Sequence, residues 1–144
     1  MKLTMNGTIN IAKNILIKNG YTCVLYSEKK EYHSTLRGVK PLIEFLNSGE
    51  NFSECCAADK TVGLGAAHLY ILLGVKSVWA NVMSTSAKKI LEQNNIQTFC
   101  DNEVAYIINR AKSGPCPIES AVSGITDSEQ ALGIIIETLK KLKT

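Results

Sequence analysis

The sequence has few residues of the kinds that bind transition metals. It contains only two histidines, His33 and His68, and no cysteine pair has the Cys-x-x-Cys spacing of a zinc site. Cys55 and Cys56 are adjacent, so on a strand their side chains would point to opposite faces and could not share an ion. We therefore expect neither a metal nor a cofactor.

Dense charge of one sign and long apolar runs are missing as well. Sixteen basic and 13 acidic residues give a formal net charge of +3, and the one basic cluster is Lys140, Lys141 and Lys143. This charge is too mild and too dispersed for a nucleic-acid-binding face. The longest apolar runs, such as 132–136, are too short to cross a bilayer, and the N-terminus does not resemble a signal peptide. We expect a cytoplasmic protein with no nucleic-acid partner and no membrane contact.

The five cysteines are an odd number in a chain without signs of secretion, which predicts free thiols rather than a disulfide framework. Four of them lie in apolar, strand-like stretches and are expected to behave as small buried hydrophobes. These four are Cys23, Cys55, Cys56 and Cys100. The fifth, Cys116, differs because it stands between two prolines.

The hydrophobic pattern predicts a single α/β domain, residues 1–144, without a linker or repeat. Segments with helical spacing are 8–19, 37–46, 61–73 and a helix that is capped by 84–86 and ends at 94–95. Segments rich in β-forming residues are 21–26, 31–36, 54–58, 75–81 and 96–100. Because single helices join the later strands, we expect those strands to pair in parallel.

The core of this domain is expected over about residues 8–100, with a helical extension over 101–144. Asp101 is predicted to cap a helix whose apolar stripe is Val104, Ile107, Ile108 and Ala111. Thr126 and Glu129 have the spacing of a capping box for a C-terminal helix. The inward residues of that helix are predicted to be Leu132, Ile135, Ile136, Leu139 and Leu142.

A strand-to-helix turn carries the first candidate site. Gly63 and Gly65 lie where a phosphate-cradling turn would be, but His68 replaces the third glycine of a dinucleotide fingerprint. The glycines therefore either leave a helix N-terminus open to an anion or let the helix pack closely on the sheet. Asp59 and Lys60 precede them at the carboxyl end of a strand, where ligands bind in open α/β sheets. The alternative is that Asp59 only caps the helix and Lys60 is solvated.

The second candidate site is the segment 113–120, SGPCPIES. Pro117 suits the first position of a helix, which makes Cys116 the N-cap and Glu119 the third helical residue. Glu119 is then expected to accept the backbone N–H of Cys116. The helix dipole favours a Cys116 thiolate, whereas the carboxylate of Glu119 opposes it. Cys116 is either a functional thiol or an incidental residue at a helix start.

Three motifs resemble those of an uncharacterised prokaryotic family of unknown function with a cytidine-deaminase-like fold. They are STLRGVKPL at 34–42, ADKTVG at 58–63 and GPCPIE at 114–119. The resemblance implies a three-layer α/β sandwich with a mixed sheet of about five strands, helices on both faces and a helical C-terminal extension. The turns that hold zinc in deaminases correspond here to 38–41 and 59–63, which lack zinc ligands. We therefore do not expect zinc-dependent deamination.

These observations predict metal-independent binding or processing of a nucleotide-like or other small anionic ligand. The expected catalytic residues are Cys116, Glu119 and Asp59. The expected ligand-binding residues are Lys60, Gly63, Arg37, Gly38 and Lys40. In an enzyme, Cys116 would be the nucleophile, with Asp59 or Glu119 as the acid–base partner. The alternatives are a non-catalytic sensor that uses the same pocket and a subunit whose terminal helices form a homo-oligomer interface.

Overall fold

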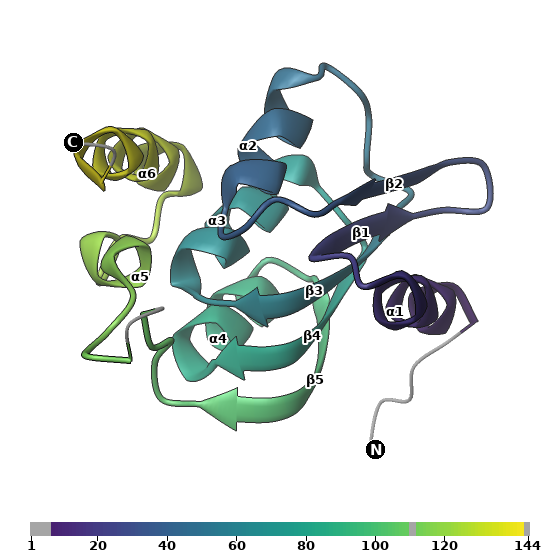
Figure 1. Ribbon diagram of the computed structural model, residues 1–144. Helices are drawn as coiled ribbons and strands as arrows, with labels where there is room; N and C mark the ends of the chain where they lie inside the picture. The colour runs from purple at the N-terminus through teal and green to yellow at the C-terminus, as the bar shows by residue number, and fades with distance from the viewer. Residues whose placement is uncertain (1–6, 110–111, 143–144) are drawn as a thin grey trace.

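The computed structural model describes residues 7–109 and 112–142, and its centre is a five-stranded mixed sheet in the order β2-β1-β3-β4-β5 (Figure 1). The strands are β1 (Cys23–Tyr26), β2 (Glu31–Ser34), β3 (Cys56–Val62), β4 (Ser77–Ser84) and β5 (Gln97–Val104). β1 is antiparallel to both of its neighbours, whereas β3, β4 and β5 are parallel to one another. The mixed sheet and the parallel pairing of its later strands confirm the prediction.

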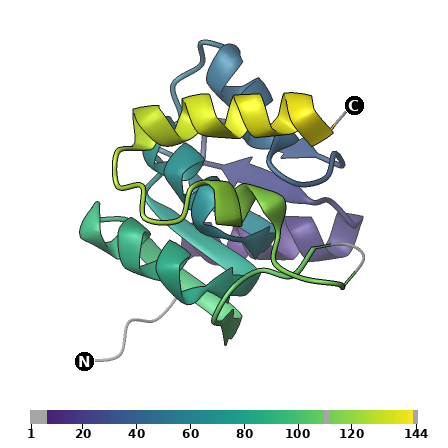
Figure 2. The same ribbon diagram turned by 90° about the vertical axis from the view of Figure 1, so that its left-hand side faces the viewer.

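Helices cover both faces of the sheet. Within the described ranges the helices are α1 (Gly7–Asn19), α2 (Lys40–Asn47), α3 (Leu64–Leu73), α4 (Thr85–Gln93), α5 (Pro117–Ala121) and α6 (Ser128–Leu142). α1 alone packs on one face, and α2, α3 and α4 lie on the other (Figure 1). α5 and α6 pack on the outer side of α3, so they form a further layer (Figure 2).

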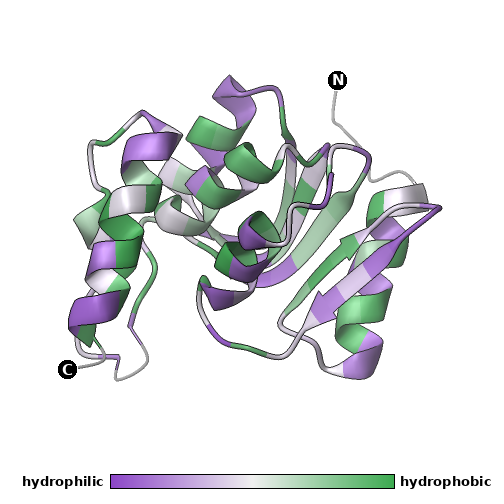
Figure 3. Ribbon diagram, turned by 90° about the horizontal axis from the view of Figure 1, so that it is seen from above, coloured by the Kyte–Doolittle hydropathy of each residue, from purple (hydrophilic) through white to green (hydrophobic). Residues whose placement is uncertain are grey.

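The sheet separates two parts of the hydrophobic core. The side chains of Cys56 and Trp79 face α1, whereas those of Ala57 and Val78 face α3 and α4. α3 is buried on most of its circumference because the sheet covers one side and the C-terminal helices cover the other. Hydrophobic residues accordingly gather in the strands and inner helices, and hydrophilic ones on the outer helices and the β1–β2 hairpin (Figure 3).

The prediction that a helix begins at Asp101 is wrong. β5 continues through Asp101 to Val104, which pairs with Ser84 at the end of β4. The strand ladder thereby satisfies backbone groups that a new helix would have to satisfy by itself. Ile107 and Ile108 follow in an irregular segment that turns back on itself, where Ile108 and Pro115 form an isolated bridge. Ala111 lies outside the described residues.

The C-terminal helix exists, but its start and its inner face differ from the prediction. Its first turn is capped by Asp127, whose carboxylate accepts the N–H of Glu129 at 3.0 Å, rather than by Thr126. Ile135 is buried and Leu132 and Leu139 are half-buried, but Ile136 and Leu142 are exposed because only one side of α6 faces the protein. Lys143 lies outside the described residues. None of the described helices is long and apolar enough to cross a membrane.

Candidate functional site

A cavity of about 390 Å³ lies at the carboxyl end of β3, between the start of α3, the segment before α2 and the C-terminal segment. Seven of the eight predicted site residues line it. They are Arg37, Gly38, Asp59, Lys60, Gly63, Cys116 and Glu119. The eighth, Lys40, is the exposed first residue of α2 and is not in the lining. Asp59 and Cys116, which are 57 positions apart in the sequence, therefore border one cavity.

Asp59 is a strand residue, not a turn residue. β3 runs to Val62, four residues beyond the predicted end at 58, and Gly63 rather than Asp59 is the N-cap of α3. The Oδ2 atom of Asp59 accepts the Tyr70 hydroxyl at 2.7 Å, and Oδ1 accepts the N–H of Thr61 at 3.3 Å. Burial raises the pKa of Asp59 to about 7, although these hydrogen bonds act in the opposite direction.

Two residues that the sequence did not indicate form a polar chain behind Asp59. The Tyr70 hydroxyl lies 3.3 Å from the Cys23 sulfur, and Cys23 is the register partner of Asp59 on β1. Burial and the nearby Asp59 carboxylate raise the pKa of both the Tyr70 hydroxyl and the Cys23 thiol, so both stay protonated. The signal in the sequence is a tyrosine in a largely apolar buried helix, since a buried tyrosine hydroxyl needs a partner.

The carboxylate of Glu119 joins three segments of the chain. Its Oε2 atom accepts the Leu64 N–H at 2.8 Å and the Ser84 hydroxyl at 2.6 Å, and Oε1 accepts the Ile107 N–H at 2.5 Å. The predicted bond to the Cys116 N–H is wrong, because that N–H donates to the Ile107 carbonyl oxygen at 2.7 Å. Glu119 therefore occupies the N-terminus of α3, where an external anion had been considered.

Gly63 and Gly65 allow the C-terminal segment to approach α3 closely. A Cβ atom at Gly63 would lie 2.9 Å from Ile107 Cγ1 and 3.0 Å from Glu119 Oε2. A Cβ atom at Gly65 would lie 2.5 Å from Ile118 Cγ2, which is closer than real Cβ contacts come. Both glycines therefore allow close packing of α3, but the segment that packs against them is the C-terminal segment rather than the sheet.

Cys116 takes its predicted place as the N-cap of α5, with Pro117 as the first helical residue. Its sulfur makes no capping hydrogen bond, and the residue is half-buried at the cavity wall. Gly38, another lining residue, has a φ of +67°, a conformation that favours glycine. This turn places the exposed Arg37 at the cavity.

His68 belongs to the packing of α6 rather than to the cavity. Its Nε2 donates to the Ile125 carbonyl oxygen at 3.0 Å, so Nδ1 is left to accept the Ser128 hydroxyl at 2.9 Å. Burial lowers the pKa of this fully buried imidazole, in keeping with its neutral form. Among residues 7–109 and 112–142, no three His, Cys, Asp or Glu side chains are grouped so that they could hold a metal ion.

Comparison with known proteins places the chain in a family. Residues 11–139 match the family described as a domain of unknown function, DUF1893 (TM1506). The chain belongs to the DUF1893 family. A crystal structure of the DUF1893 family protein TM1506 from Thermotoga maritima has a TM-score of 0.84 and 24% sequence identity, over 96% of this chain and 92% of that one. No curated protein matches the chain. The DUF1893 membership gives the family and the fold, so the roles of residues around the cavity depend on their geometry.

Proposed function

We propose that this DUF1893 protein binds and processes a small anionic, nucleotide-like ligand in the cavity at the end of β3, without a metal. The observation that supports this most is that Asp59, whose carboxyl group has a pKa raised to about 7, lines the same cavity as the basic residues Arg37 and Lys60. A cavity with a few convergent polar groups and a perturbed carboxyl group is a good candidate for a ligand site.

The anionic part of the ligand is held by Arg37 and Lys60. Both are exposed lining residues, and a guanidinium can bind a phosphate or carboxylate through two parallel hydrogen bonds. The N-terminus of α3 does not take this role, since the carboxylate of Glu119 already accepts the Leu64 N–H. Gly38 adds no side chain to the lining and leaves room for the ligand, whereas Gly63 contributes backbone to the lining and its space is taken by Ile107 and Glu119.

Proton transfer is assigned to Asp59. A carboxyl group with a pKa of about 7 is populated in both protonation states at neutral pH, so it can give or accept a proton. Tyr70 holds its Oδ2 atom in place from inside the core. Glu119, whose two oxygens accept three hydrogen bonds, positions the C-terminal segment. Cys116 remains the candidate nucleophile at the cavity wall.

The same proposal includes a cytidine-deaminase-like fold. Its support is the element order of helix, hairpin, helix and then alternating strands and helices, together with a five-stranded mixed sheet. The turns at 38–41 and 59–63 both border the cavity and hold no zinc-binding side-chain set. The deaminase-type pocket is therefore proposed to serve a metal-independent role.

A thermal-shift screen with nucleotides and sugar phosphates tests the binding step. A ligand at about 100 times its Kd should stabilise the protein by about 2.7 kcal/mol. Arg37→Gln and Lys60→Gln should each abolish most of the shift, whereas Lys40→Gln should retain it because Lys40 lies outside the lining. If no anion raises the Tm, or if Lys40→Gln acts like Arg37→Gln, the binding site is assigned wrongly.

Product analysis with a ligand found in that screen separates an enzyme from a sensor. An enzyme converts the ligand, and Asp59→Asn slows the conversion while binding persists. Turnover that is unchanged in Asp59→Asn would contradict the role given to Asp59. Binding without any turnover would favour the non-catalytic sensor.

A further inference from the structure

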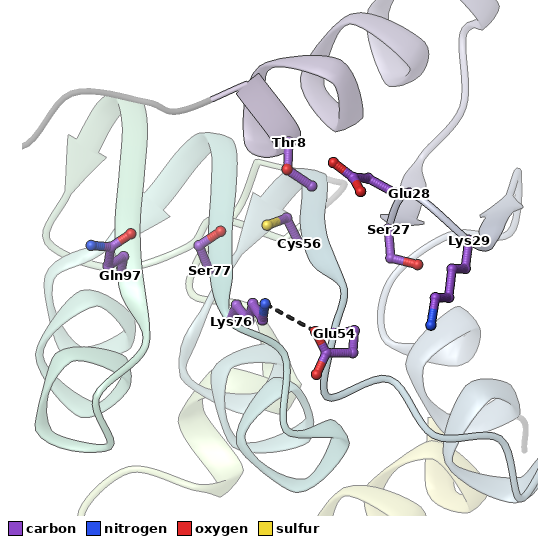
Figure 4. Close-up of a pocket in the computed structure, with 9 residues that line it drawn as sticks. All are labelled: Thr8, Ser27, Glu28, Lys29, Glu54, Cys56, Lys76, Ser77 and Gln97. Atoms are coloured by element: carbon purple, nitrogen blue, oxygen red, sulfur yellow. Dashed lines mark ion pairs between the residues drawn. The ribbon is translucent and has the colours of Figure 1, made fainter.

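A second cavity, of about 500 Å³, lies at the opposite edge of the sheet from the candidate site (Figure 4). Its base is formed by Cys56, Ser77 and Gln97, the first residues of the three parallel strands. Ser77 is the register partner of both Cys56 and Gln97, so the three side chains form a row across the sheet. None of these residues belongs to the site described above.

The side chain of Ser77 is the feature of this cavity that points to a ligand. The residue is only 3% exposed, and its hydroxyl has no hydrogen-bond partner within the part of the chain that the structure describes. Figure 4 shows this hydroxyl beside the Cys56 sulfur in the cavity. A buried hydroxyl without a partner is unfavourable for the fold, and such groups are rare in proteins. A ligand in the cavity would supply the missing partner.

The rim of the cavity carries both signs of charge in equal number. Glu28 and Lys29 come from the turn between β1 and β2. Lys76 and Glu54 form an ion pair at 3.1 Å, with side chains 57% and 77% exposed. Exposed ion pairs contribute little to stability, so ligand groups can replace either partner at small cost. A multiply charged anion would meet two carboxylates, and a cation would meet two lysines, so this rim suits a molecule that carries one charge of each sign.

We propose that this cavity binds a small zwitterion, namely a free α-amino acid. The ammonium group pairs with Glu54 and the carboxylate with Lys76, in place of the ion pair between these two residues, and a polar atom of the ligand pairs with the Ser77 hydroxyl. This site is separate from the proposed anion site, since the two cavities share no lining residue.

An NMR titration of the full-length ¹⁵N-labelled chain with single L-amino acids tests the proposal. At least one of them should shift the backbone amides of Cys56, Lys76, Ser77 and Gln97 in a saturable way. Its N-acetylated and carboxamide derivatives, which each lack one charge, should bind at least about tenfold more weakly. Glucose and inorganic phosphate serve as the neutral and anionic probes.

The variant Ser77→Ala connects the binding to the unpartnered hydroxyl. It should weaken amino-acid binding by about tenfold. It should also leave the Tm of the free protein unchanged or higher, because it removes a buried polar group that has no partner in the fold. Ser123→Ala, an exposed serine after α5, is the control and should change neither binding nor Tm.

Three outcomes would overturn the proposal. They are the absence of a response to any amino acid, the same amide shifts with glucose or phosphate in place of an amino acid, and a lower Tm for Ser77→Ala. The last result would mean that the hydroxyl already has a partner within the protein. Because the titration does not involve Arg37, Lys60 or Asp59, it can fail while the proposed function holds, and the reverse is also true.

Discussion

The two edges of the parallel sheet differ in whether a buried serine hydroxyl of β4 has a hydrogen-bond partner. At the carboxyl edge the hydroxyl is hydrogen-bonded, and at the amino edge it has no partner among the described residues. Ser84, at the carboxyl end, is fully buried, donates to Glu119 and accepts the N–H of Ala87. Ser77, at the amino end, is also buried, but its hydroxyl has no hydrogen-bond partner among the described residues. Satisfied polar groups stabilise a fold, whereas unsatisfied ones destabilise it and so indicate a ligand or a functional need.

At the carboxyl edge, the two buried carboxyl groups of Glu119 and Asp59 also differ in their surroundings. The carboxylate of Glu119 lies at the N-terminus of α3, where an external anion could otherwise bind, and its hydrogen bonds join three segments of the chain. Asp59 borders the same cavity, but burial keeps the pKa of its carboxyl group near neutrality. One carboxyl group therefore joins segments of the chain, and the other is the proposed proton donor and acceptor.

Removal of the Glu119 carboxylate should have the largest effect on stability. Glu119→Ala removes the acceptor of the N–H groups of Leu64 and Ile107 and of the Ser84 hydroxyl, and the groups of Leu64 and Ser84 are buried. We expect a loss of about 3–5 kcal/mol in the free energy of unfolding, measured by urea denaturation.

Two further variants control the Glu119 experiment. Glu119→Gln keeps one acceptor oxygen and the shape of the side chain, so it should lose about half as much. Glu137→Ala removes an exposed carboxylate that pairs with Lys140, and it should cost less than about 1 kcal/mol. Equal losses for Glu119→Ala and Glu137→Ala would show that the three hydrogen bonds do not stabilise the edge.

Asp59 should make stability depend on pH in an unusual direction. Its pKa is raised from 3.8 to about 7, so the folded chain keeps this proton between pH 4 and 7 while the unfolded chain loses it. The contribution to stability is therefore complete below pH 4, falls as the pH rises to about 7, and is constant above. The change is on the order of 4 kcal/mol.

The variant Asp59→Asn isolates this contribution. The difference in unfolding free energy between the variant and the wild type should move in favour of the variant from pH 4 to pH 8. Asp101→Asn, at an exposed position of β5, is the control for the loss of one surface carboxylate. A difference for Asp59→Asn that does not change with pH would contradict the raised pKa.

The sequence predicted the sheet and its covering helices because those elements depend on local spacing and on short connections. The helix start at Cys116 and Pro117 was also predictable, since proline fixes its own φ at a value that suits the first position of a helix. The helix that was predicted to begin at Asp101 could not be judged from local spacing alone, since this residue lies in β5. The spacing of Val104, Ile107 and Ile108 fits a helix, but pairing with the neighbouring strand determines the structure up to Val104.

The sequence indicated most residues that line the candidate site, but it did not indicate their hydrogen-bond partners. Glu119 bonds residues that are 55, 35 and 12 positions away in the sequence, and Cys23 meets Tyr70 over 47 positions. A single sequence contains no signal for such pairs, because each depends on how the C-terminal segment or β1 packs in space. Glu119, which the sequence predicts to be a local helix cap, therefore links segments that are distant in the sequence.

The smallest effects, and the sharpest comparison, come from the two serines of β4. Ser84→Ala removes a donor to Glu119 and the N-cap of α4, and should cost about 1–2 kcal/mol in unfolding free energy. Ser77→Ala, with the same change in composition on the same strand, should cost nothing or stabilise the protein slightly. Urea denaturation of the two variants side by side measures the difference directly. Equal losses would mean that both edges use their buried hydroxyls structurally, and the distinction between a self-satisfied edge and a ligand-binding edge would then be wrong.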